Sequence, residues 1–176
     1  QLSQLYNTVQ SSTAALHKLF VIIDAVPDVD EVAHPTELST RGALEVDQVT
    51  FAYAGNDREV LKDVTISVAD GERLALVGPT GAGKSTLAKL MARLYDPSES
   101  NGHRGTVSYG GVDLRQASNS DLRRRIVVVP QEGFCFSGSI RENIRIARST
   151  ASDGEVEEAL VSIGALERFT EFPEGL

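Results

Sequence analysis

Apolar residues recur at alternating steps of three and four along the first 26 residues, a spacing that predicts one amphipathic helix over 1–26. The positions in this register are Leu2, Leu5, Val9, Ser12, Leu16, Leu19 and Ile23. Such a seam suits contact with another helix, and Pro27 ends it. Two interpretations fit the pattern equally: a helix packed on its own domain, or a stalk that descends from an upstream part of a longer protein.

The pattern changes after this helix. Residues 27–43 are polar, carry a proline and predict a linker. From residue 44 apolar and polar positions alternate, which predicts strands over 44–53 and 60–68 on either side of the turn-forming residues 54–57. A similar strand and turn is expected over 105–113.

Two short runs are apolar or nearly so, which is typical of strands buried in a parallel sheet. The first, 73–77, follows the turn signal Asp70-Gly71; the second, 126–129, ends at Pro130. Helical spacing follows the first run, with Pro97 as a stop signal, and a short helix closes at 122–125. From Ser139 onward the sequence predicts helices.

The nine residues 78–86, Gly-Pro-Thr-Gly-Ala-Gly-Lys-Ser-Thr, form a complete phosphate-binding loop between strand and helix. Glycines allow backbone N–H groups to turn inward around phosphate oxygens, and the start of the helix adds its positive dipole end. Lys84 can contact the β- and γ-phosphates, and the Ser85 hydroxyl can ligate Mg²⁺. The candidate phosphate-binding residues are Gly78, Thr80, Gly81, Ala82, Gly83, Lys84, Ser85 and Thr86.

Composition narrows the class of partner. The formal net charge is −8, so a nucleic acid is not expected as a partner, because proteins that bind it carry a basic face. Cys135 is the single cysteine, which excludes an internal disulfide and favours a reducing compartment. The three histidines are scattered and predict no metal site. No run of 18 or more apolar residues occurs. The first residue is not Met, so the chain is expected to be an internal piece of a longer protein.

A second motif decides between nucleotide-binding families. The segment Val129-Pro130-Gln131 is followed by Phe136-Ser-Gly-Ser-Ile-Arg-Glu-Asn-Ile144. In both parts the chain resembles the ATP-binding cassette family, in particular the nucleotide-binding domain of ABC exporters. The resemblance implies that Gln131 belongs to the loop that reaches Mg²⁺ and the attacking water; the alternative is a glutamine at a surface strand end. It also implies that Tyr53 stacks on adenine, whereas a core position in a hairpin is the alternative.

The resemblance covers nearly the whole chain and implies its organisation. The expected fold is α/β: a P-loop NTPase (RecA-like) core with an antiparallel β subdomain and the start of a helical subdomain, preceded by an N-terminal helix. Residues 44–138 would form the N-terminal part of the core, and 139–176 the start of the helical subdomain. Residues 1–26 would be the cytoplasmic end of the last transmembrane helix, which places the domain on the cytoplasmic side of the cell membrane.

The same resemblance implies an ATP hydrolase that drives transport, with ATP and Mg²⁺ as cofactors. Lys84 and Gln131 would act in catalysis, and Ser85 and Gln131 would hold the metal. The expected partners are a second nucleotide-binding domain, in a homo- or heterodimer, and a transmembrane domain upstream in the same polypeptide.

Three family motifs are absent from the sequence: Leu-Ser-Gly-Gly-Gln, an apolar strand that ends in Asp-Glu, and the switch histidine that follows. The chain is therefore expected to bind Mg·ATP without turnover. The runs 73–77 and 126–130 would lack neighbouring strands, which predicts low stability or association of the isolated chain.

Other classes remain open from the sequence. They are a soluble ABC ATPase without a membrane domain, another P-loop protein such as a GTPase or small-molecule kinase, and a non-enzymatic binding module. The guanine-reading pattern Asn-Lys-x-Asp is absent, which disfavours the GTPases.

Overall fold

The computed structural model describes residues 2–56, 58–100 and 102–171. The chain divides into two compact units, with the boundary between Val128 and Val129. Within helices and strands, the side chains of residues 1–9, 11, 14 and 170 are also outside the description, so the predicted seam positions Leu2, Leu5 and Val9 cannot be compared. The last residue of the predicted 54–57 turn and the end of the predicted 139–176 segment, from 172 onward, lie outside the described residues as well.

Helix α1 (Leu2–Ile23) opens the first unit, and every one of its described side chains is exposed. Residues 28–38, which we call the strap, have no regular secondary structure but do pack on the unit. Leu38 is buried in the core, and the Thr36 N–H donates to the Gln116 carbonyl at 2.7 Å. No described helix is both long enough and apolar enough to cross a bilayer.

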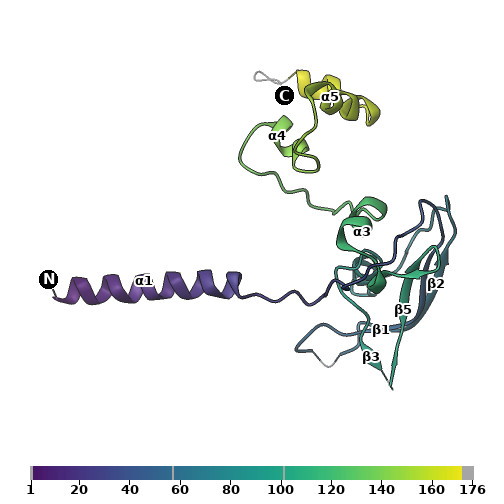
Figure 1. The fold of residues 1–176 in the computed structure, drawn as a ribbon, viewed down its shortest axis with the longest axis horizontal. Coiled ribbons are helices and arrows are strands. Elements are labelled where there is room, and N and C mark those ends of the chain that lie inside the picture. Colours follow the sequence, from purple (N-terminus) through teal and green to yellow (C-terminus); the bar gives the residue numbers. More distant parts are fainter. Residues whose placement is uncertain (1, 57, 101, 172–176) are drawn as a thin grey trace. The chain divides into compact units, whose positions relative to one another are not determined.

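A four-stranded antiparallel sheet organises the first unit, in the order β2-β1-β5-β6. Figure 1 labels three of its strands, β1, β2 and β5. Its strands are β1 (Leu44–Phe51), β2 (Leu61–Val68), β5 (Thr106–Tyr109) and β6 (Val112–Asp113). Strands β3 (Glu99–Ser100) and β4 (His103–Arg104) pair antiparallel in a small separate sheet. The predicted strands over 44–53, 60–68 and 105–113 are thus confirmed.

Helix α2 (Lys84–Met91), the 3₁₀ turn η1 (Leu114–Gln116) and α3 (Asn119–Arg125) complete the first unit. Their apolar side chains form one core with the sheet and with Leu38 of the strap. The fully or nearly buried members are Leu38, Val46, Val49, Phe51, Leu61, Leu87, Leu90, Val107, Leu114, Ala117 and Leu122. The start of α2, where the phosphate loop ends, is therefore anchored on a packed core.

The prediction of parallel strands over 73–77 and 126–129 was wrong. Residues 73–77 and 126–129 have no regular secondary structure, and no described residue pairs with them in a ladder. Val77 and Val129 are each 89% exposed. An apolar run becomes a parallel strand only where neighbours supply hydrogen bonds and cover both faces. The parallel sheet of a RecA-like core is consequently not formed in the described residues, whereas the antiparallel sheet and helices of the P-loop fold are.

The second unit contains α4 (Ile140–Arg145), α5 (Asp153–Ser162) and α6 (Leu166–Thr170). Serine caps begin the first two helices. Ser139 and Glu142 form a reciprocal capping box at α4, and Ser152 and Glu155 form one at α5. Asp153 lies 2.6 Å from the guanidinium groups of both Arg141 and Arg145, which joins the two helices.

Candidate nucleotide-binding site

The phosphate loop is an exposed turn that runs into α2. Gly81 and Gly83 have φ values of 84° and 85°, in the left-handed region that glycine adopts most easily. Within the turn the Ala82 N–H donates to the Pro79 carbonyl at 3.2 Å. Residues 78–82 and Ser85 are exposed, so their backbone and hydroxyl groups are open to a ligand. The first N–H groups of a helix have no partner within the helix, which makes this end of α2 suitable for an anion.

Gly83 is required for steric as well as conformational reasons. A Cβ atom at this position would lie 2.7 Å from Leu61 Cδ2 and 3.0 Å from the Val60 carbonyl oxygen. The loop therefore lies directly on the start of β2. This close approach fixes the first turn of α2 against the sheet.

The Lys84 side chain folds back over its own loop. Its Nζ donates to the carbonyl oxygens of Gly78 and Pro79, at 2.8 Å each. The ammonium group thus lies at the centre of the turn, where it would meet phosphate oxygens. An entering phosphate would replace the two carbonyl acceptors with charged oxygens, to which hydrogen bonds are stronger.

Tyr53 connects β1 to the helix of the loop. Its hydroxyl lies 3.0 Å from Thr86 Oγ1, and Thr86 is buried. The ring is half-buried and packs edge-on with Phe51 and Tyr95, at centroid distances of 4.9 and 5.4 Å. The Lys89 ammonium lies 6.0 Å from the ring centroid. The structure therefore shows the core position that was the alternative to adenine stacking, and stacking remains a prediction.

Gln131 is exposed and belongs to the second unit, whereas the phosphate loop belongs to the first. Each is therefore described by itself. The segment that follows is held by Asn143. Its side-chain amide accepts from the Phe136 N–H at 2.7 Å and donates to the carbonyls of Phe136 and Ser139. Phe134 and Phe136 are exposed and pack edge-on with each other, and Cys135 between them is exposed too. The catalytic and metal roles of Gln131 remain predictions.

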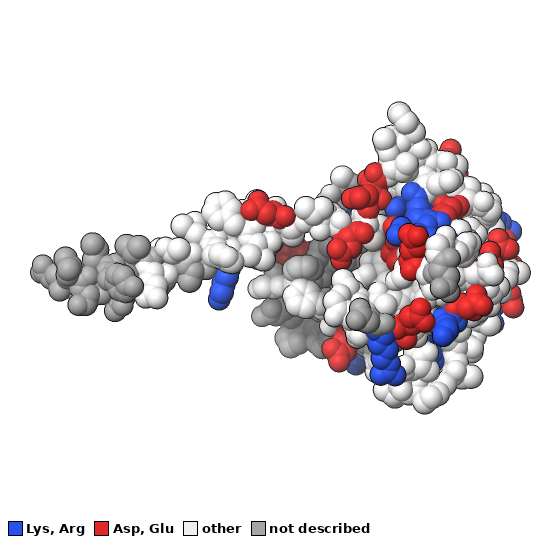
Figure 2. All heavy atoms as spheres, turned by 90° about the horizontal axis from the view of Figure 1, so that it is seen from below, with Lys and Arg blue, Asp and Glu red and all other residues white. Residues whose placement is uncertain are grey.

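The site's attraction for anions is local. On the face drawn in Figure 2, acidic and basic side chains are interspersed, and no basic patch gathers there. Since the chain carries a net charge of −8, the loop amides and Lys84 have to supply the attraction. Mg²⁺ takes oxygen ligands and keeps several waters. The exposed Ser85 hydroxyl fits this chemistry, with most ligands coming from phosphate and water.

Sequence reasoning missed two residues that lie just beyond the end of α2. Tyr95 completes the aromatic group around Tyr53, and Arg93, next to the end of α2, is buried with 4% of its surface exposed. Tyr95 could have been expected, because it is the only aromatic residue between Tyr53 and Tyr109 in the sequence. Nothing in the local pattern marks Arg93, because its partners come from distant segments.

Comparison with known proteins identifies the family of the chain. The family model described as ABC transporter matches residues 61–173. The uncharacterized ABC transporter ATP-binding protein YknV of Bacillus subtilis is 36% identical over 178 residues, which cover 99% of this chain and 28% of that protein. Human ATP-binding cassette sub-family B member 6 is 37% identical over 172 residues, 97% of this chain and 20% of its own length.

A solved structure, that of a bacterial Atm1-family ABC exporter with ATP bound, is also similar. Its TM-score is 0.78 at 34% identity, covering 99% of this chain and 30% of that one. The chain thus spans less than a third of the length of the relatives it matches. Because the family model matches well over half of the chain and an exporter structure is similar over 99% of it, the chain belongs to the ABC transporter family and covers part of an exporter-type ATP-binding domain.

Proposed function

We propose that the chain binds Mg·ATP through residues 78–86. The observation that carries the proposal is the position of Lys84 Nζ, which bonds two loop carbonyls at the start of a helix anchored on the core. The glycine backbone and the helix start would hold the phosphates, and Lys84 would neutralise the β- and γ-phosphates.

Mg²⁺ would be held by Ser85, with Gln131 as the second protein ligand, and when bound it neutralises charge on the phosphates. Ser85 is placed for this role because it is exposed at the first turn of α2. Tyr53, two residues beyond the end of β1, would stack on adenine. Its ring is tied by its hydroxyl to Thr86 and so stays beside the loop.

In the intact protein we propose that ATP binding and hydrolysis drive export across the cell membrane, with this domain on the cytoplasmic side. Lys84 and Gln131 would take part in hydrolysis. The partners would be a transmembrane domain upstream in the same polypeptide and a second nucleotide-binding domain, identical or not. Relatives support export: one is the beta-(1-->2)glucan export ATP-binding/permease protein NdvA of Agrobacterium fabrum, 37% identical over 166 residues. This support favours transport over a soluble ABC ATPase.

A calorimetric titration with Mg·ATP tests the binding proposal. Lys84→Ala should abolish saturable binding because it removes the cation at the centre of the loop. Lys62→Ala is the matched control, since the Lys62 side chain is 84% exposed on β2 and its ammonium group lies 3.9 Å from the Glu59 carboxylate. Binding that survives Lys84→Ala, or that Lys62→Ala abolishes equally, would contradict the proposal. Phosphate release on the order of one per second by the chain alone would contradict binding without turnover.

A further inference from the structure

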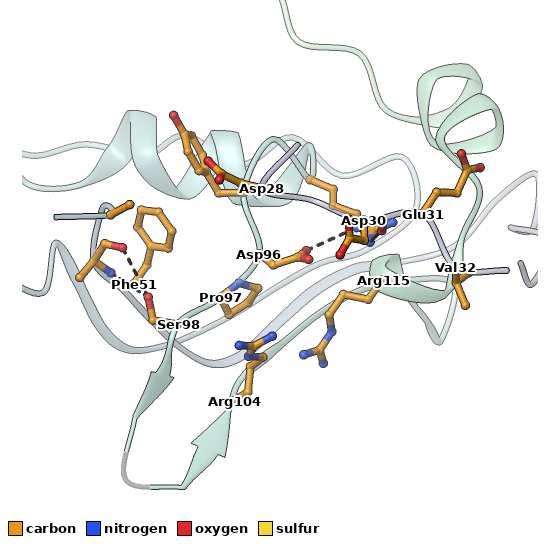
Figure 3. Close-up of a pocket in the computed structure, with 14 residues that line it drawn as sticks. Asp28, Asp30, Glu31, Val32, Phe51, Asp96, Pro97, Ser98, Arg104 and Arg115 are labelled. Atoms are coloured by element: carbon orange, nitrogen blue, oxygen red, sulfur yellow. Dashed lines mark hydrogen bonds and ion pairs between the residues drawn. The ribbon is translucent and has the colours of Figure 1, made fainter. Parts of the chain in front are cut away.

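The strap crosses a hollow in the first unit. A pocket of about 600 Å³ lies beneath it (Figure 3). Asp30, Glu31 and Val32 line this pocket from the strap, and Asp96, Pro97 and Ser98 line it from the segment after α2. Where residues 30–32 of the strap pass over this pocket, continuous packing cannot hold them. Their position therefore depends on individual contacts.

The most buried of these contacts is made by Arg93. Its Nη2 donates to the Asp30 carbonyl at 2.7 Å, and its Nη1 donates to the Ala117 carbonyl at 3.3 Å. Its Nε lies 3.3 Å from the Asp96 carboxylate. A buried cation is costly unless it is paired and hydrogen-bonded, and here three segments supply the partners.

The backbone of Arg93 is unusual as well. Its φ is 49°, in a region that residues other than glycine seldom adopt. Such a conformation persists where the surroundings over-determine it. The burial, the three partners and the backbone angle all indicate that Arg93 is held in one position.

Arg93 also lies at the opposite end of α2 from the phosphate loop. The helix has eight residues, so about 12 Å separate its ends. This end is held from α3 too, because Arg123 Nη1 donates to the Ala92 carbonyl at 3.0 Å. A short, anchored helix moves as one piece. A shift at the loop would therefore reach Arg93 and, through it, the strap.

We propose that Arg93 is a positioning residue that fastens the strap to the helix of the phosphate loop and couples nucleotide binding to the order of the strap. The coupling rests on the proposed function, whereas the fastening does not. Coupling of this kind is reciprocal: if bound nucleotide steadies the strap, a steadied strap favours nucleotide.

A spin label on the strap tests both parts in the full chain. His34→Cys places the label on an exposed strap residue, and Cys135→Ser removes the single, exposed native cysteine. In this background Arg93→Met removes the cation but keeps the bulk. Arg123→Met is the matched control, because it removes a hydrogen bond to the same helix end without touching the strap. Arg93→Lys, which cannot reach both carbonyls, replaces Arg93→Met if that variant does not fold.

Without nucleotide, the ratio of mobile to immobile label should rise by about tenfold in Arg93→Met, as expected for the loss of a hydrogen bond from a charged donor. Arg123→Met should leave the ratio near that of the parent. An equal rise in both variants, or no rise in either, overturns the fastening.

With saturating Mg·ATP, the ratio should fall by about fivefold in the parent and stay unchanged in Arg93→Met, although calorimetry still detects binding. If Arg93 had a purely structural role, Arg93→Met would not abolish this response. Binding of Mg·ATP without a response in the parent overturns the coupling alone. Absence of Mg·ATP binding in the parent contradicts the proposed function instead, and the comparison without nucleotide still decides the fastening.

Discussion

At the scale of single residues, two glycines of the phosphate loop allow backbone strain to be separated from steric crowding. Gly81 and Gly83 have nearly the same positive φ, but only Gly83 is crowded: apart from its two chain neighbours, no described residue comes within 4 Å of a Cβ built on Gly81. Gly81→Ala should therefore lower the free energy of unfolding by about 1 kcal/mol, from backbone strain alone. Gly83→Ala should lower it by about 2–4 kcal/mol, because the methyl group also meets Leu61 and the Val60 carbonyl.

Urea denaturation of the two variants beside the parent measures this difference. Equal losses would show that Leu61 moves aside freely. The loop would then not be fixed by its contact with β2.

Tyr53 can be tested at the same scale. Tyr53→Phe removes the hydrogen bond to Thr86 and keeps the ring, so it should cost about 0.5–1.5 kcal/mol of stability and leave Mg·ATP affinity nearly unchanged. Tyr53→Leu removes the ring and should weaken binding if the ring stacks on adenine. Denaturation and calorimetry on both variants separate the two roles. Equal ATP affinity in the parent and Tyr53→Leu would leave the core position as the single role of Tyr53.

At the scale of elements, the capping boxes make the helices of the second unit sensitive to acid. The Ser139 backbone N–H and then its hydroxyl lower the pKa of Glu142 below its ordinary value of 4.5. The Ser152 backbone N–H and hydroxyl, followed by Arg148, lower the pKa of Glu155 in the same way. A lowered pKa in the folded state stabilises the fold above the ordinary pKa, and that stabilisation is lost as the pH falls through the lowered value.

Helical circular dichroism should therefore decrease as the pH falls from about 5 to about 3. Glu142→Gln with Glu155→Gln keeps side chains that can complete a capping box but do not titrate. The double variant should show a smaller decrease over this range. The same acid transition in both proteins would assign the loss of helix to other carboxylates, such as Asp153, whose pKa is lowered chiefly by its hydrogen bond with Arg141.

Elements also show what the sequence could predict. The antiparallel strands and the loop followed from patterns that lie within a few residues, namely alternation in 44–53 and glycine spacing in 78–86. Residues 73–77 carry an equally clear apolar pattern, yet a parallel strand depends on neighbours that this pattern does not contain. Arg93 escaped for the same reason: its acceptors at Asp30 and Ala117 are far away along the chain.

At the scale of the whole molecule, the unpaired apolar segments predict association. Val77, Val127 and Val129 are 89%, 77% and 89% exposed, and their backbones lack ladder partners in the described residues. Unpaired, apolar extended chain is a template for pairing with another copy. Val127→Ser with Val129→Ser should shift sedimentation toward the monomer. Ile163→Ser, at a residue 74% exposed in the second unit, should have no such effect. A parent chain that is monomeric and melts cooperatively would refute the prediction.

The contact between Arg93 and the strap also bears on how this protein can change during evolution. Arg93 binds the carbonyl oxygen of residue 30, an atom that every amino acid provides. Mutation can therefore exchange the side chain at position 30 without disturbing the bond. We therefore expect homologues to keep the arginine at position 93 while the side chain at position 30 varies. The two positions would then show no covariation. Methods that infer contacts from correlated substitutions will thus miss the contact between Arg93 and the strap.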